Sequence, residues 1–234
     1  MSVIPSNLQA VHAQIVAAAR MASRNPDDIM LLAVSKTFGA DAVLEAAHAG
    51  QRAFGENYVQ EAVDKITAIR LAHPDLALEW HFIGPIQSNK TRLIAEHFDW
   101  VHSIEREKIA QRLAEQRPSH LPPLNVCLQI NISGEASKSG ADPADAAVLA
   151  RAVAAMPQLR LRGLMAIPEA TADIEQQRQP FRLLRELRDR LGSDGLALDT
   201  LSMGMSTDMT AAIAEGATIV RVGTAIFGQR DHAN

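Results

Sequence analysis

Lys36 is the first residue of this sequence whose position suggests covalent chemistry. It directly follows the apolar run IMLLAVS (29–35), which has the length of a buried strand. A lysine at such a strand end can lose hydration, which lowers its pKa and frees the amine to attack a carbonyl group. The simpler alternative is a solvated lysine that follows a strand. The position of Lys36 alone leaves both interpretations open.

Two loops near the C-terminus contain residue types that bind phosphate. The motif SMGMS ends at Ser206, which we expect to cap a helix over 207–215, and the motif RVGT ends with Gly223 and Thr224. A helix N-terminus attracts anions, glycine lets backbone amides approach a ligand, and the threonine hydroxyl can donate to it. Ordinary capping and turn chemistry explains either loop equally well. Asp208 opposes a phosphate at the first loop unless its carboxylate points away.

Arg221 interrupts an apolar segment, IVRVG. A buried guanidinium without a partner is costly, so Arg221 needs either an ion pair, for example with Glu56, or a ligand. A lysine, an arginine and a phosphate loop together describe a site for pyridoxal phosphate (PLP). The aldehyde would go to Lys36 and the ring nitrogen to Arg221. The phosphate would bind Ser206, Gly223 and Thr224.

Other residues carry weaker signals. His81 and His102 fall in neighbouring expected strands, but no HExxH or paired-carboxylate pattern accompanies them, so we expect core histidines and no metal site. Lys138 lies in the loop GEASKSG and is either a solvated lysine or a further contact for a phosphate or an aldehyde.

We expect the arginine-rich segment 178–190 to form a solvated outer helix with one apolar face. Cys127 is expected to be an inert core thiol.

The candidate residues share one place in the predicted secondary structure, just after an apolar segment. Eight such segments alternate with helical patterns; they are apolar on both faces, which is typical of a parallel sheet covered by helices. We therefore predict an α/β fold, a (β/α)8 barrel over 29–228, with an open doubly wound sheet as the alternative. Active sites of such barrels lie at the C-terminal ends of the strands. The segments end near residues 35, 57, 84, 104, 131, 167, 204 and 223.

Further helices are expected before and within the barrel. An amphipathic helix is predicted within residues 1–25, with Ser6 as its N-cap. Asp142 and Pro143 are expected to open the helix after the fifth strand, because aspartate favours the N-cap and proline the first helical position. No linker or charge block marks a boundary, so we expect residues 1–234 to form a single domain.

Composition excludes several classes of protein. Hydrophobic residues make up 47% and charged residues 21% of the 234 residues, as in a globular protein. The net charge of −4 gives no basic field for nucleic acid. No apolar run approaches the length of a membrane span, and no secretory signal precedes the first helix. We expect a cytoplasmic protein that binds neither nucleic acid nor a membrane.

The motifs of this sequence resemble the pyridoxal phosphate homeostasis protein family (YggS/PROSC). The resemblance covers about residues 30–228 and rests on VSKT, FGENYVQE, WHFIGPIQSNK, INISGEASKSG, GLMAI, LSMGMSTD and VRVGTAIFG. It implies the barrel of alanine racemase, known as PLP fold type III. It also implies PLP bound as a Schiff base on Lys36, with Asn57 beside the cofactor and Arg221 facing the ring nitrogen. The phosphate would be held by Ser206, Gly223 and Thr224.

The resemblance implies a role in binding PLP and supplying it to apo-enzymes. An arginine keeps the ring nitrogen unprotonated and weakens the ring as an electron sink, so we expect no robust catalytic activity. The alternative is an amino-acid racemase or another fold type III enzyme; a Schiff-base aldolase without cofactor is a third possibility. Related racemases use a tyrosine from a partner subunit as second base and a second domain. Here Tyr58 is the single tyrosine, few residues follow the last strand, and we expect a monomer.

Overall fold

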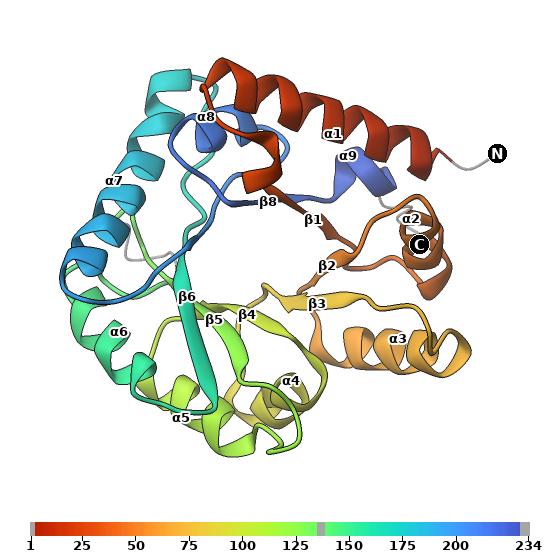
Figure 1. The fold of residues 1–234 in the computed structure, drawn as a ribbon, viewed down its shortest axis with the longest axis horizontal. Helices are drawn as coiled ribbons and strands as arrows, with labels where there is room; N and C mark the ends of the chain where they lie inside the picture. The colour runs from red at the N-terminus through yellow and green to blue at the C-terminus, as the bar shows by residue number, and fades with distance from the viewer. Residues whose placement is uncertain (1–2, 135–138, 230–234) are drawn as a thin grey trace.

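The computed structural model describes residues 3–134 and 139–229. Its eight strands form a closed barrel in the order β1 to β8, and every neighbouring pair is parallel. The strands lie at the centre and the helices surround them (Figure 1). All eight predicted segments are strands, and the open sheet is excluded. Their bounds are Met30–Val34 (β1), Ala53–Glu56 (β2), Glu79–Phe82 (β3), Trp100–Ile104 (β4), Leu124–Gln129 (β5), Leu159–Met165 (β6), Thr200–Ser202 (β7) and Ile219–Val222 (β8).

Helices cover the outer face of the barrel. Alternate strand residues point outward into a large apolar layer beneath the helices. Short 3-10 turns at Pro26–Asp28 (η1) and Ser88–Lys90 (η2) precede β1 and α4. The helices are Ile4–Met21 (α1), Ala40–His48 (α2), Val59–Ala72 (α3), Thr91–His97 (α4), Glu107–Gln116 (α5), Ala146–Ala154 (α6), Ile174–Ser193 (α7), Met209–Ala214 (α8) and Thr224–Phe227 (α9).

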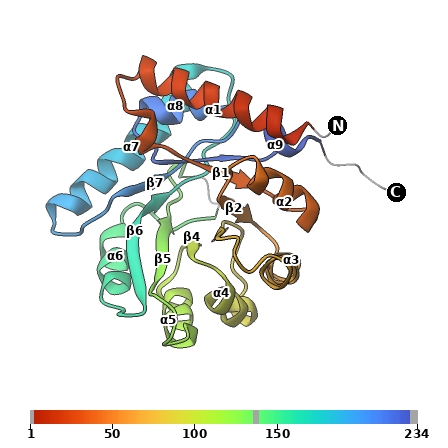
Figure 2. The same cartoon turned by 45° about the vertical axis from the view of Figure 1, so that its right-hand side comes forward.

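Helix α1 is the predicted addition to the barrel. It packs against α8, α9 and α2, and Figure 2 shows it lying across α8 and α9. Leu8, Val11 and Ile15 are buried on its inner side, and each such side chain contributes about 1.5–3 kcal/mol. Asn7 fastens the helix by donating to the Ile226 carbonyl of α9 over 2.9 Å. None of the described helices is long and apolar enough to cross a membrane.

Three predicted helix caps are wrong. Helix α1 begins before Ser6, whose hydroxyl donates to the Val3 carbonyl from within the first turn. Asp142 accepts the Ala144 amide in a turn, and α6 begins only after Asp145. Helix α8 begins at Met209, after Asp208 rather than Ser206. Ser6 and Asp142 make local side-chain hydrogen bonds instead of the predicted caps.

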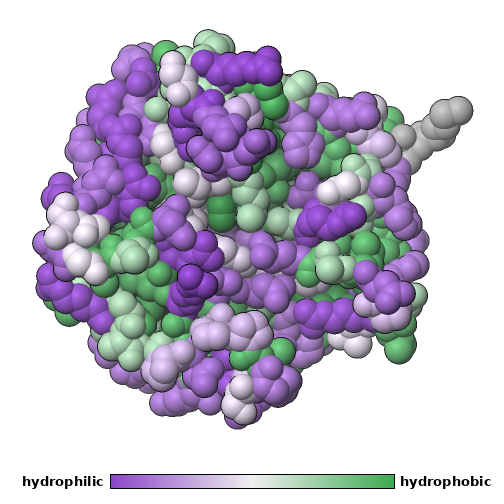
Figure 3. Space-filling view, viewed as in Figure 1, coloured by the Kyte–Doolittle hydropathy of each residue, from purple (hydrophilic) through white to green (hydrophobic). Residues whose placement is uncertain are grey.

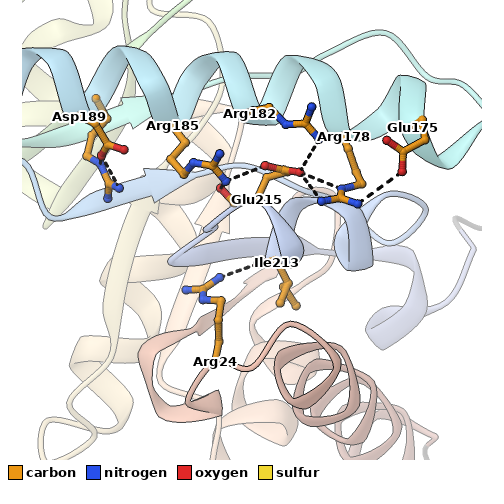
Figure 4. Close-up of polar contacts among 9 residues, drawn as sticks. Arg24, Glu175, Arg178, Arg182, Arg185, Asp189, Ile213 and Glu215 are labelled. Atoms are coloured by element: carbon orange, nitrogen blue, oxygen red, sulfur yellow. Dashed lines mark hydrogen bonds and ion pairs between the residues drawn. The ribbon is translucent and has the colours of Figure 1, made fainter.

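The arginine-rich helix α7 is held by more than its apolar face. Phe181, Leu184, Leu187 and Leu191 are buried, as the sequence predicts. In addition, the buried Glu215 at the end of α8 receives three arginines of α7 (Figure 4). The shortest ion-pair distances are 2.7 Å from Arg178, 3.2 Å from Arg182 and 2.6 Å from Arg185. Part of the segment expected to be solvated is therefore an ion-pair contact between two helices.

Candidate functional site

The barrel register brings the predicted site residues to one end of the molecule. Strand β1 lies between β8 and β2, and Val34 is opposite Gly55 while Ala33 is opposite Val222. Extending these parallel pairings places Lys36 beside Asn57 on one side and beside the start of α9 on the other. The ring of Phe38 stacks on that of Phe227 at 5.1 Å, which joins the loop after β1 to α9.

The loop that carries Lys36 is held by two charged residues of α3, the buried Lys65 and the partly exposed Glu61. Lys36 itself is half-buried, and the next residue, Thr37, has a φ of 70°, a left-handed conformation that is costly for a β-branched residue. The Thr37 amide donates to Glu61 over 2.6 Å. Lys65 of α3 donates to the Ser35 carbonyl over 3.0 Å. Bonds on both sides of Lys36 therefore keep this strained turn in place.

Lys65 and Glu56 form a buried ion pair behind that turn. Their side chains are 3% and 0% exposed, and Lys65 Nζ lies 2.6 Å from Glu56 Oε1. The Ser35 hydroxyl also donates to Oε1, over 2.6 Å. Burial raises the pKa of Glu56, and the charge of Lys65 opposes that rise. Sequence reasoning missed Lys65; its only signal is a lysine among the apolar positions of the helix 59–72.

Arg221 is buried on the inner face of β8, and none of the residues that the structure describes forms an ion pair with it. Its Nη1 donates to the carbonyl and the hydroxyl of Ser202, both at 2.8 Å, and its Nη2 donates to the Ala166 carbonyl at 3.0 Å. Glu56 is bound to Lys65 instead, so the suggested Arg221–Glu56 pair is wrong. Burial lowers the pKa of Arg221 to about 10, which still leaves the guanidinium charged. The hydrogen bonds of Arg221 to described residues all use its Nη atoms and leave its Nε–H group without an acceptor among them.

Ser206 is exposed in the loop between β7 and α8. It precedes the helix instead of capping it. The carboxylate of Asp208 accepts the backbone amide of Met205 over 2.5 Å. Asp208 is thus folded back onto its own loop, and the Met205 amide is no longer available to an anion. Burial raises the pKa of Asp208, whereas the Met205 amide and the charge of Arg221 lower it.

Gly223 and Thr224 lie where β8 passes into α9. A Cβ on Gly223 would lie 3.1 Å from the Val34 carbonyl oxygen, so the missing side chain lets this turn approach the end of β1. Thr224 is exposed at the first position of α9. The two residues therefore lie beside the loop that carries Lys36.

Asn57 completes the group from the β2 side. Its Oδ1 atom is buried and has no hydrogen-bond partner within residues 3–134 and 139–229. Its backbone touches Gly84, where a Cβ would lie 2.8 Å from the Asn57 Cα. Gly84 is held in turn by the Ser103 hydroxyl, which donates to its carbonyl over 2.6 Å. A ligand that donates a hydrogen bond can supply the partner that this buried amide oxygen lacks.

A cavity of about 270 Å³ adjoins Asn57 at the mouth of the barrel. Tyr58, next in sequence, is 51% exposed. The face shown in Figure 3 is mostly hydrophilic, with apolar residues in separate patches. The cavity is lined by Asn57, Ile83, Pro85, Gln129, Ile167 and Pro168.

His81, His102 and Cys127 are buried within the barrel. His81 and His102 are fully buried and 2.9 Å apart, so they are core histidines as predicted, and the described ranges contain no cluster of three metal-ligating side chains. Cys127 is buried and its pKa is raised to about 12 by burial, in agreement with an inert thiol. Lys138 lies outside the described residues.

Comparisons with known proteins identify relatives of this chain. Residues 6–231 match the alanine racemase N-terminal domain family. The pyridoxal phosphate homeostasis protein of Pseudomonas aeruginosa is 62% identical over 232 residues, 99% of this chain and 98% of that protein. PipY of Synechococcus elongatus, solved with PLP bound, is 39% identical with a TM-score of 0.79, covering 93% of this chain and all of its own. Alanine racemase from Corynebacterium glutamicum shares the fold at 20% identity and a TM-score of 0.65, over 97% of this chain and 63% of the racemase.

Proposed function

This chain belongs to the pyridoxal phosphate homeostasis protein family, and from that membership we propose that it holds PLP on Lys36 and supplies the cofactor to apo-enzymes. The observation that carries the proposal is the register of β1 between β8 and β2. It brings a lysine, a buried arginine and a threonine at a helix start to one barrel mouth.

The residues at this mouth fit PLP on physical grounds. The unpartnered Oδ1 of Asn57 can accept a hydrogen bond from a ligand. The absence of a Cβ at Gly223 leaves the end of β1 close to the start of α9. Arg221 has an Nε–H donor that no described residue uses. These features suit a ligand with a phosphate at one end and a ring nitrogen acceptor, as PLP has.

PLP supplies an aldehyde that condenses reversibly with a primary amine and releases water. Lys36 is the residue that would hold this aldehyde. The Lys65–Glu56 pair and Glu61 hold the backbone on both sides of Lys36. The cavity lined by Asn57, the neighbour of Lys36 in the extended strand register, would give water or an incoming amine a route towards Lys36, as release of the cofactor requires.

Arg221 would donate a hydrogen bond to the ring nitrogen. The pKa of about 10 keeps the Arg221 guanidinium charged at neutral pH, so Arg221 would donate a hydrogen bond to the ring nitrogen and would not transfer a proton to it. An unprotonated ring withdraws electrons weakly, which favours storage of the cofactor over turnover. Ser206, Gly223 and Thr224 would hold the phosphate. All these residues come from one chain, so a monomer suffices for the site.

Replacement of Lys36 tests the covalent role. The wild-type protein should be yellow when loaded with PLP, and its visible band should move on borohydride reduction, which fixes the cofactor to the lysine. Lys36→Ala should lose the reducible linkage, whereas Lys108→Ala, an exposed lysine on α5, should retain it. An unchanged stoichiometry of reducible PLP in Lys36→Ala would refute the assignment.

Two further variants separate the ring from the phosphate. Arg221→Glu should allow the ring nitrogen to be protonated and change the absorption of bound PLP. Ser206→Ala should weaken retention of PLP without changing its spectrum. Supply of cofactor is tested by mixing the loaded protein with an apo-enzyme in the presence of a scavenger of free PLP. Activation of the apo-enzyme despite the scavenger is expected; complete suppression of activation would exclude direct transfer.

A further inference from the structure

A continuous line of hydrogen bonds runs through the barrel interior below Arg221. Arg221 Nη1 lies 2.8 Å from Ser202 Oγ, and Ser202 Oγ lies 2.7 Å from His102 Nδ1. His102 Nε2 lies 2.9 Å from His81 Nδ1, and His81 Nε2 lies 2.8 Å from Glu79 Oε1. The three middle residues are 0% exposed, whereas the Glu79 side chain is 42% exposed. Because Glu79 begins β3, the line connects the base of the barrel with its mouth.

The chemistry of the two ends determines where every proton in this line lies. Arg221 can only donate, so Ser202 Oγ accepts, and the Ser202 hydroxyl proton is left for His102 Nδ1. A neutral His102 must then carry its proton on Nε2 and donate to His81 Nδ1. His81 in turn carries its proton on Nε2 and donates to Glu79, which as a carboxylate can only accept. The opposite tautomers would set a bare His81 nitrogen against the Glu79 carboxylate at 2.8 Å.

Charges around the line favour two neutral imidazoles. Burial lowers the pKa of His102 well below its ordinary value, and the nearby charges of His81 and Arg221 lower it further. Burial also lowers the pKa of His81, although its bond to Glu79 and the charge of Asp99 oppose this. The hydrogen bond from His81 keeps the pKa of Glu79 low, so this carboxylate is ionised at neutral pH. Several cations lie near the base of the barrel: Arg162 of β6 lies over the Trp100 ring, and a pocket that Glu79 and Asp99 line is also lined by Arg52, Arg117 and Arg160.

We propose that Glu79, His81, His102 and Ser202 form a positioning relay for Arg221. Every hydrogen bond in this line has a fixed donor and a fixed acceptor. The Glu79 carboxylate at the base of the barrel therefore fixes the orientation of the Ser202 hydroxyl, and the hydroxyl in turn orients the guanidinium of Arg221. Ser202 and Ala166 occupy three of the five N–H groups of Arg221, which leaves its Nε–H group and one Nη2–H group for the cofactor ring. This inference rests on the proposed function, because it assigns the relay to the arginine that would face the ring nitrogen.

The first test uses the cofactor-free protein and is independent of PLP. We expect ¹⁵N NMR spectra of the imidazole nitrogens to show His81 and His102 as neutral rings protonated on Nε2, unchanged between about pH 6 and 8. A doubly protonated ring, or a proton on Nδ1 of either ring, would overturn the relay. Because no cofactor is present, this result stands whether or not Lys36 binds PLP.

The second test breaks the line far from the cofactor. Glu79→Met removes the terminal acceptor at the opposite end of the barrel, so His81 is no longer held with its proton on Nε2. We expect a shift in the absorption of bound PLP and an affinity for PLP weaker by about tenfold. Glu79→Gln keeps an oxygen that accepts from His81 and should restore both values towards wild type. An unchanged spectrum and affinity in Glu79→Met would overturn the positioning role.

A second variant keeps the test decisive if Glu79→Met does not fold. Ser202→Ala removes the link that touches Arg221, and Thr200→Val removes a buried hydroxyl of the same strand that bonds to Asp199 instead. The relay requires that only Ser202→Ala changes the PLP spectrum; equal spectra in the two variants would refute it. Borohydride-reducible PLP at saturation should stay at wild-type stoichiometry in both. The stoichiometry of reducible PLP in Lys36→Ala tests the proposed function, whereas the PLP spectra of Ser202→Ala and Thr200→Val test the relay. Failure of the relay is therefore distinguishable from failure of the proposed function.

Discussion

Replacing Lys65 with methionine removes the buried ammonium group behind the Lys36 loop. In the wild-type protein Lys65 Nζ lies 2.6 Å from Glu56 and 3.2 Å from Glu61, and donates to the Ser35 carbonyl over 3.0 Å. Methionine has nearly the same length but no charge and no donor. The substitution therefore leaves the Glu56 carboxylate buried beside an apolar side chain, with only the Ser35 hydroxyl as partner.

The size of the effect follows from the burial of the pair. Removal of one partner of a buried ion pair costs about 3–5 kcal/mol of unfolding free energy. The upper part of that range is expected here, because Glu56 is fully buried and its Oε2 has no hydrogen bond to any described residue even in the wild type. At about 2–4 °C per kcal/mol for a chain of this size, the midpoint of thermal unfolding should fall by roughly 10 °C.

The loss of unfolding free energy in Lys65→Met should depend on pH. Burial already raises the pKa of Glu56, and Lys65 opposes that rise, so Lys65→Met should raise the pKa further above its unfolded value. A group with a raised pKa in the folded state favours folding at low pH and loses that advantage as the pH rises through the folded pKa. The deficit of the variant should thus be greatest at neutral and alkaline pH and smaller near pH 5.

Urea unfolding followed by circular dichroism measures this deficit. Lys108→Met, at an exposed position of α5, is the matched control and should change the unfolding free energy by less than about 0.5 kcal/mol. The double variant Glu56→Gln with Lys65→Met removes both charges and should recover part of the loss. A Lys65→Met protein within about 1 kcal/mol of wild type at neutral pH would contradict the assignment of Lys65 and Glu56 as a buried pair.

Three further predictions follow from other contacts. Burial raises the pKa of Glu215, but hydrogen bonds from the α7 arginines outweigh burial, and the net pKa is lowered. Glu215→Gln should therefore lower the free energy of unfolding by about 1–2 kcal/mol above roughly pH 5, and this difference from wild type should disappear as the pH falls through the folded pKa. Urea titrations at several pH values would measure it. Gly84→Ala should weaken PLP binding, because its Cβ would collide with the Asn57 backbone, whereas Gly192→Ala, with open space around it, should not; equal PLP titrations would contradict this. Cys127 should resist an aromatic disulfide reagent at pH 8 until urea unfolds the chain, since its pKa is about 12; fast labelling of the native protein would show that the thiol is accessible.

The fold was predictable from the sequence because the signal is local. Each strand is a short apolar run that can be recognised from consecutive residues, and all eight strands lie where these runs predict them. The same holds for α7, whose four apolar residues at helical spacing are the buried ones. Caps were less predictable, because a serine or aspartate near a helix start has several local hydrogen-bond partners, as Ser6 and Asp142 show.

The sequence by itself determined the barrel, the end of the barrel that carries the candidate site, and the residue types present there. Only the tertiary structure decided which side chains meet. Glu56 pairs with Lys65 instead of Arg221, and His102 reaches Ser202, a hundred positions further along the chain. The physical reason is that barrel closure and strand register bring together residues with no sequence relationship. The protonation of each buried group then depends on those neighbours and not on its own residue type.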